Sequence, residues 1–263
     1  MIETFLIKPF FAIILIAISS ALLGVFVLWK KLSYFGDALS HSILLGLILG
    51  TVCEVNQISA IIFFAFLFSF AVRLISQNRY FSKDTIVMIL SYFCVALAVI
   101  LNDVWIKDFA FTSYIFGDVL TVESQDLWAL AAIATVVIFY VSYSFKKILL
   151  INVNQDLAQI EGVKTEFWNL TFLILLSLAI ALSVRIVGVF LMTALIILPA
   201  AIARIFSVSA KQMMCLSLAI AVSISALSFK VAIIYDLTIS SMIVVIFSTI
   251  FVASLLFKKI ISA

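Results

Sequence analysis

Charged residues are scarce in this sequence. Asp, Glu, Lys and Arg make up 11% of the 263 residues, whereas hydrophobic residues make up 66%. Soluble globular proteins contain about 25% charged and about 45–50% apolar residues. The composition therefore excludes a soluble protein and predicts a polytopic membrane protein. Because the apolar runs are much longer than strands and do not alternate with polar residues, we expect an all-α fold rather than an outer-membrane barrel.

Residues that serve metal or nucleotide sites are also few. The three cysteines, Cys53, Cys94 and Cys215, are widely spaced and form no Cys-x-x-Cys pair, so we interpret them as small hydrophobic side chains. A Gly-x-x-x-x-Gly-Lys-Ser/Thr phosphate loop is absent, which excludes an ATPase site of that type on this chain. With one histidine there is no His-Glu-x-x-His pair, and this excludes an intramembrane metalloprotease of that class.

The apolar segments predict about nine transmembrane helices in a single domain, 1–263, because a bilayer span needs about 20 apolar residues. The segment 103–121 is apolar in its middle but carries Asp108 and Asp118, so we expect an interfacial or re-entrant helix there. The nine predicted spans are 9–29, 37–52, 57–75, 84–101, 126–145, 166–184, 186–203, 210–229 and 237–257.

The basic residues predict the orientation in the membrane. Lys and Arg concentrate in cytoplasmic loops, and placing the N-terminus outside puts twelve of the 16 on the cytoplasmic side together with the C-terminus. Since these residues lie at segment ends, the net charge of +3 gives no indication of a nucleic-acid partner. The twelve are Lys30, Lys31, Arg73, Arg79, Lys83, Lys146, Lys147, Lys164, Arg204, Lys211, Lys258 and Lys259.

The histidine, His41, stands four residues after Asp37 in the second predicted span. Residues at i and i+4 share one helix face, with Cβ atoms about 5–6 Å apart. Ionisable residues in a membrane segment usually mark an ion or substrate path. We therefore interpret Asp37 and His41 as candidate metal ligands. The alternative is structural, with Asp37 capping the helix and His41 satisfied inside the bundle.

Three other features carry less specific predictions. Gly46 and Gly50 form a Gly-x-x-x-Gly spacing that either permits close helix packing or arises by chance. Asp118 either faces a permeation pathway or caps a re-entrant helix. Asn154 and Gly162 fit the cap and the stop of a short cytoplasmic helix.

Pro199 lies near the end of the seventh predicted span, just before Arg204. Proline removes one helical hydrogen bond and clashes with the preceding turn, so we expect the helix to kink or end there. The structural interpretation is a simple helix terminus, and the functional one is a rigid elbow that leads into a cytoplasmic docking surface over about 199–211. Residues 156–163 form a second candidate surface.

Four motifs in this order resemble the membrane permease subunits of ABC-type zinc/manganese uptake systems, and among them the high-affinity zinc uptake permeases. They are Tyr34-Phe35-Gly36-Asp37-Ala38-Leu39-Ser40-His41, Phe116-Gly117-Asp118-Val119-Leu120, the segment 156–163, and 187–204 with its Thr-Ala-Leu-x-x-x-Pro-Ala-Ala core.

The resemblance implies a permease fold like that of vitamin B12-type importers, in the bacterial cytoplasmic (inner) membrane. It also implies a homodimer, a cytoplasmic ATP-binding subunit and an extracytoplasmic metal-binding protein as partners, besides membrane lipid. The chain would then be a transport subunit and not an enzyme. A short cytoplasmic helix over 199–211 would dock on the ATPase, with Pro199, Arg204 and Lys211 as the coupling residues. It would hold no permanent cofactor and would carry Zn²⁺, or alternatively Mn²⁺ or Fe²⁺, since all three accept histidine with carboxylate.

An ATP-independent secondary transporter or channel for a divalent cation is the alternative function. Such transporters use broken helices in a repeated architecture, whereas this sequence has one proline-broken segment and no evident repeat.

Overall fold

The computed structural model describes residues 2–75, 81–106 and 117–261, and these residues form helices without strands. The elements, in chain order, are α1 (Ile2–Trp29), α2 (Ser33–Val52), α3 (Gln57–Ile75), α4 (Lys83–Leu101), the π-helix η1 (Asn102–Ile106), the 3-10 helix η2 (Val119–Thr121), α6 (Ser124–Val153), α7 (Gln155–Ile160), α8 (Thr165–Phe206), α9 (Ala210–Ile234) and α10 (Ile239–Ile261).

Eight helices in the described part of the chain are long and apolar enough to cross a membrane, and α8 is by far the longest of them. Its 42 residues are interrupted at Gly188, where φ is 79° and ψ is 163°. Glycine alone adopts this region readily, because it has no Cβ. The two parts of α8 on either side of Gly188 correspond to the predicted spans 166–184 and 186–203, so the expectation of about nine spans is confirmed.

Pro199 itself does not end its helix. The helix continues past Pro199 to Phe206, and Gly188 is the residue with a non-helical backbone. Proline removes one helical hydrogen bond, but the Pro199 side chain is buried in the bundle and stays within α8. The interruption of α8 therefore lies at Gly188 and not at Pro199.

The predicted boundaries were also too narrow at several helices. α2 begins at Ser33, whereas the predicted span began at 37, and it has 20 residues. α6 continues to Val153, well beyond the predicted end at 145. Tertiary packing extends these helices past the apolar stretch that sequence patterns detect. The predicted re-entrant segment 103–121 includes 107–116, which lies outside the described residues, so it stays a prediction.

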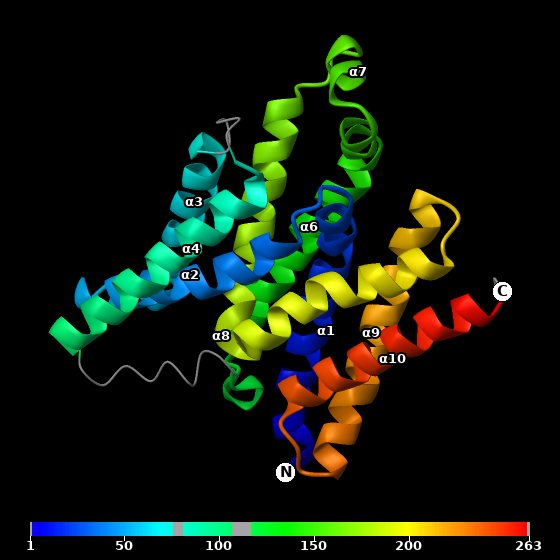
Figure 1. Ribbon diagram of the computed structural model, residues 1–263. Coiled ribbons are helices and arrows are strands. Elements are labelled where there is room, and N and C mark those ends of the chain that lie inside the picture. The colour runs from blue at the N-terminus through cyan, green and yellow to red at the C-terminus, as the bar shows by residue number, and fades with distance from the viewer. Residues whose placement is uncertain (1, 76–80, 107–116, 262–263) are drawn as a thin grey trace.

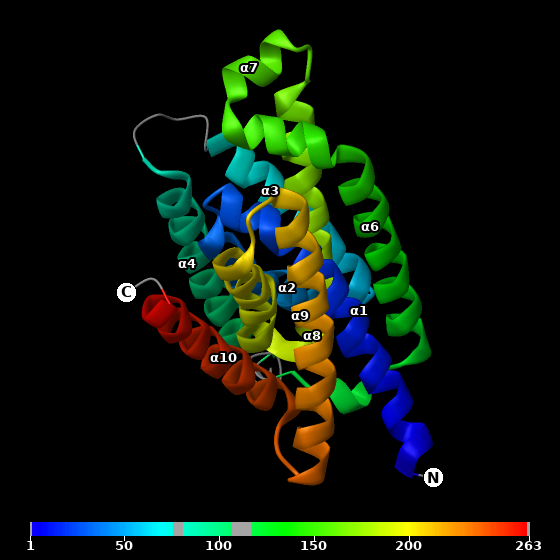
Figure 2. The same ribbon diagram turned by 90° about the vertical axis from the view of Figure 1, so that its right-hand side faces the viewer.

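Helix α1 packs against α6, α8 and α9 (Figure 2). Its contact with α8 is very close, because a Cβ built on Gly24 would lie 1.9 Å from the carbonyl oxygen of Ile196. Only glycine fits such a backbone approach. Helix α2 is the centre of a second group of contacts, because it packs against α3, α4 and α8.

The Gly-x-x-x-Gly spacing on α2 is a packing motif. A Cβ on Gly46 would lie 2.7 Å from Cβ of Phe64, and a Cβ on Gly50 would lie 2.6 Å from Cβ of Ala60. Phe64 and Ala60 both belong to α3. These glycines let α2 and α3 approach closely, and the opposite face of α2 remains for other contacts.

The bundle has two distinct ends. The short helix α7 projects beyond the other helices at one end, and the N-terminus lies at the opposite end (Figure 1). Asn154 caps α7 by accepting hydrogen bonds from the backbone N–H groups of Asp156 and Leu157, at 2.9 and 3.1 Å. Gly162 follows with a φ of 76°, so the predicted start and stop of this helix are confirmed.

Candidate metal site

Asp37 and His41 lie one turn apart on α2, as the spacing predicts. His41 Nε2 is 3.7 Å from Asp37 Oδ1, and the side chains are 40% exposed for His41 and 54% exposed for Asp37. Their neighbours on the helix are buried, including Phe35, Leu39 and Ile43. The pair therefore stands at an open position on an otherwise packed apolar helix.

The structural alternative for Asp37 was wrong. Leu32 occupies the N-cap position of α2, and Asp37 lies beyond the first turn, inside the helix. The His41 side chain is not enclosed by the bundle either, since its exposed fraction is 40%. Neither residue is explained by helix capping or core packing within one chain.

A cavity of about 350 Å³ opens next to this pair, between α2 and α4. From α2 it is lined by Tyr34 and Ala38 besides Asp37 and His41. The α4 wall, which sequence reasoning missed, contains Met88, Ser91, Tyr92 and Val95. Their spacing of three and four residues places them on one face of a helix, a signal that was present in the sequence.

One chain supplies an incomplete metal site. In the part of the chain that the structure describes, no group of three or more His, Cys, Asp or Glu side chains comes together. Asp37 and His41 offer one carboxylate and one imidazole, whereas a zinc site usually has four ligands. Among the described residues, Asp37 and His41 therefore supply two of the four ligands that a zinc site usually has.

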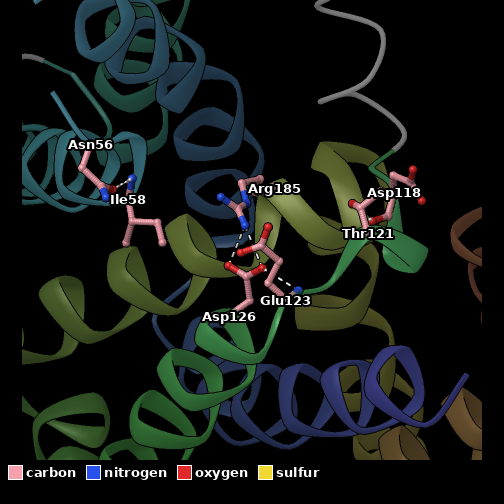
Figure 3. Close-up of polar contacts among 7 residues, drawn as sticks. All are labelled: Asn56, Ile58, Asp118, Thr121, Glu123, Asp126 and Arg185. Atoms are coloured by element: carbon pink, nitrogen blue, oxygen red, sulfur yellow. Dashed lines mark hydrogen bonds and ion pairs between the residues drawn. The ribbon is translucent and has the colours of Figure 1, made fainter. Parts of the chain in front are cut away.

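A second acid–base pair joins α6 to α8, and sequence reasoning missed it. Arg185 Nη2 donates to both carboxylate oxygens of Asp126, at 2.6 and 2.7 Å (Figure 3). Asp126 Oδ2 also accepts the backbone N–H of Glu123 at 3.1 Å. The Asp126 side chain is 8% exposed and that of Arg185 is 30% exposed. Both residues lay at the ends of predicted spans on the same membrane side, which was the available signal.

Asp118 does not join either pair. Its Oδ1 accepts the backbone N–H of Leu120 at 3.0 Å, and it caps η2, while its side chain points away from Asp126 and Arg185 (Figure 3). The neighbouring Gly117 packs on the break in α8, where a Cβ would lie 2.3 Å from the backbone nitrogen of Gly188. The geometry favours a capping role for Asp118 over a place on the permeation pathway.

The surface around Arg204 and Lys211 is a turn between two helices. The predicted separate helix over 199–211 was wrong, because α8 runs to Phe206 and α9 begins at Ala210. Arg204 and Lys211 are exposed beside this turn, and Val208 within it is 96% exposed. Lys258 Nζ donates to the carbonyl of Ile205 at 2.7 Å and ties the turn to α10. Pro199 lies deeper, in the buried part of α8.

Comparison with known proteins places the chain in a family. A family model described as the ABC 3 transport family matches residues 2–258. The chain belongs to the ABC 3 transport family. The predicted resemblance to ABC-type metal permeases is thereby confirmed, and the chain is a multi-pass membrane protein. The comparisons do not favour the alternative of a transporter that works without ATP.

Two relatives of this ABC 3 family chain illustrate the similarity. The high-affinity zinc uptake system membrane protein ZnuB of Haemophilus influenzae is 36% identical over 204 residues, covering 76% of this chain and 77% of that protein. The manganese import system permease protein ScaB of Streptococcus gordonii is 30% identical over 241 residues, covering 92% and 87%.

A solved structure confirms the fold. PsaBC from Streptococcus pneumoniae in complex with Fab superposes with a TM-score of 0.83 at 26% identity, covering 95% of this chain and 90% of that one. The predicted all-helical permease fold is therefore correct.

Proposed function

We propose that this chain is the permease subunit of an ATP-driven importer that moves a divalent metal ion, with zinc as the preferred ion, across the bacterial cytoplasmic membrane. The observation that carries the proposal is the open Asp37–His41 pair on α2. A carboxylate and an imidazole that face away from the core of a membrane protein are costly to expose to lipid. They are explained if this face borders the path of a cation.

The second pair of ligands comes from a second copy of the chain in this proposal. A two-fold axis next to α2 brings two identical faces together, so that two carboxylates and two imidazoles surround one ion. Carboxylate oxygen and imidazole nitrogen both suit zinc. The incomplete site in each chain also suits transport, since an ion that is held too tightly is not released.

The test is metal uptake by a His41→Ala variant in a complex with its ATPase. Uptake should fall by more than about tenfold, because even the loss of a residue that only supports a metal ligand weakens binding by about 10–100-fold. Assembly with the ATPase should be unchanged. Ser42→Ala is the matched control, since Ser42 donates to the carbonyl of Ala38 and does not line the cavity. Normal uptake by His41→Ala would refute the proposal.

The choice of zinc rests on His41 and on the relatives. Imidazole suits zinc, although manganese and iron also accept histidine with carboxylate. The relatives named above are a zinc uptake protein and a manganese import permease. Competition of zinc, manganese and iron for uptake by one preparation decides the ion, and stronger inhibition by manganese than by zinc would exclude the zinc preference.

ATP hydrolysis takes place on a separate cytoplasmic subunit in this proposal. The turn after α8 transmits the conformational change of that subunit to the permease. Arg204 and Lys211 are exposed there for pairing with acidic residues of the ATPase, and Pro199 supports the helix behind them. The side facing α7 is then cytoplasmic, with the N-terminus outside and the C-terminus inside. The outer side receives the ion from an extracytoplasmic metal-binding protein.

An Arg204→Glu variant tests the coupling. Reversing this charge should leave basal ATP hydrolysis in the complex intact and lower the number of ions moved per ATP. The reason is that the turn would no longer move together with the ATPase subunit. The ratio of metal uptake to phosphate release measures this. Lys146→Glu is the control, since Lys146 is exposed on α6 and lies outside the turn. An unchanged ratio in Arg204→Glu would exclude this surface.

A further inference from the structure

A cavity of about 410 Å³ lies at the end of the bundle that carries α7, away from the Asp37–His41 pair. Its walls come from the turn between α1 and α2, the last turn of α3, the end of α6 and the start of α8. Figure 2 shows these helix ends beneath α7. None of the roles discussed above uses this cavity.

The cavity is lined by three cationic side chains and one carboxylate. Lys30 Nζ donates to Asn169 Oδ1 and lies 5.5 Å from the centre of the Phe172 ring. Arg73 Nη2 pairs with Glu166 Oε2 at 2.8 Å. Lys31 is exposed and adds a positive charge. The excess of cations makes the cavity attractive to an anion.

An unpaired donor strengthens this electrostatic picture. Asn152 lines the cavity, and its Nδ2 is buried without a hydrogen-bond acceptor in the structure. A buried polar group without a partner costs free energy. An anionic oxygen in the cavity would provide the missing acceptor.

Lys31 occupies a backbone position that usually holds glycine. Its φ is 55°, and the backbone N–H of Leu32 donates to the carbonyl of Val27 at 3.0 Å. This is the pattern of a Schellman helix end, whose left-handed residue is most often glycine because it carries no Cβ penalty. A lysine at this position keeps a cation at the mouth of the cavity despite the strain, which is typical of a residue held for function.

The surroundings place the cavity at the membrane interface. Trp168 directly precedes Asn169 in the chain, and Lys147 Nζ lies 4.6 Å from the Trp168 ring and 4.5 Å from the Tyr143 ring. Tryptophan and tyrosine with adjacent lysines are enriched at the level of lipid headgroups. Apolar side chains, among them Trp29 and Phe172, form the remaining wall of the cavity.

We propose that this cavity binds the phosphate headgroup of an anionic phospholipid in the leaflet at the α7 end. Lys30 and Lys31 neutralise the phosphate, Asn152 donates to one of its oxygens, and the apolar wall holds the start of an acyl chain. Basic pockets between helix ends are a known mode of headgroup binding. The inference concerns lipid binding and does not depend on which ion is transported.

Native mass spectrometry of the full-length chain in detergent tests the proposal. Phosphatidylglycerol is titrated in, with phosphatidylcholine and inorganic phosphate as separate probes. One phosphatidylglycerol per chain should bind tightly. Phosphatidylcholine should bind at least about fivefold more weakly, because its headgroup has no net negative charge to interact with a lysine. Equal affinity for both lipids would overturn the proposal, as would complete displacement of the lipid by millimolar phosphate.

Two substitutions of Lys31 separate binding from folding. Lys31→Gln should weaken phosphatidylglycerol binding about fivefold, the loss expected for one interfacial lysine. Lys31→Gly should weaken it equally while the helix end becomes less strained, so a folding defect cannot explain that result. Lys146→Gln removes one charge from the exposed face of α6 outside the cavity and should leave affinity within twofold. An equal loss in Lys146→Gln, or no loss in both Lys31 variants, would overturn the proposal.

Discussion

The Asp126–Arg185 pair and the Asp37–His41 pair differ in how far the chain itself satisfies them. In the first, one guanidinium nitrogen donates to both carboxylate oxygens at 2.6 and 2.7 Å, and the carboxylate is buried. In the second, the closest atoms are 3.7 Å apart, and the side chains are 40% exposed for His41 and 54% exposed for Asp37. The two pairs have similar chemistry but opposite environments.

The difference separates a structural role from a functional one. A buried carboxylate whose two oxygens both accept hydrogen bonds holds α6 against α8 and is shielded from a ligand. A carboxylate and an imidazole with free capacity on an apolar face are available to an ion or to a second chain. Perturbed or unsatisfied charges in a membrane are the ones to examine for function.

The largest expected effect comes from breaking the buried pair. Asp126→Ala leaves Arg185 without its partner, and the loss of one member of a buried ion pair costs about 3–5 kcal/mol. Because Arg185 is 30% exposed, we expect the lower end, about 3 kcal/mol. Thermal unfolding in detergent measures this loss. Unfolding at the wild-type midpoint would show that the pair is not structural.

An intermediate effect should follow when both members of this pair are replaced. In Asp126→Leu with Arg185→Leu no charge is left unpaired, and apolar replacement of a buried ion pair is often neutral. We expect the double variant to regain most of the stability that Asp126→Ala loses, to within about 1 kcal/mol of the wild type. A double variant as unstable as the single one would indicate that hydrogen bonding to Glu123, and not charge pairing, stabilises this site.

The smallest effect on stability is expected at the open pair. Asp37→Ala should change the free energy of unfolding by less than about 0.5 kcal/mol, since exposed i,i+4 pairs contribute little. The same unfolding assay measures it, next to metal uptake, which should be lost. A large loss of stability here would remove the contrast between the two pairs.

The sequence predicted the helices better than their contacts. Long apolar runs between polar loops sufficed for α3, whose predicted range 57–75 equals Gln57–Ile75. The Asp37–His41 pair was predictable because i,i+4 geometry is local. Asp126 and Arg185 are 59 positions apart, and their contact depends on how α6 and α8 pack. The α4 wall of the cavity depends in the same way on the packing of α2 against α4.

The break at Gly188 decides on which side of the membrane everything after it lies. A straight helix of 42 residues would be about 63 Å long, roughly twice the thickness of the hydrocarbon core. Such a helix would count as a single crossing, and the turn with Arg204 and Lys211 would emerge on the opposite side. Within the described residues, the break at one glycine therefore adds a crossing, and with it changes the side from which a partner can reach that turn.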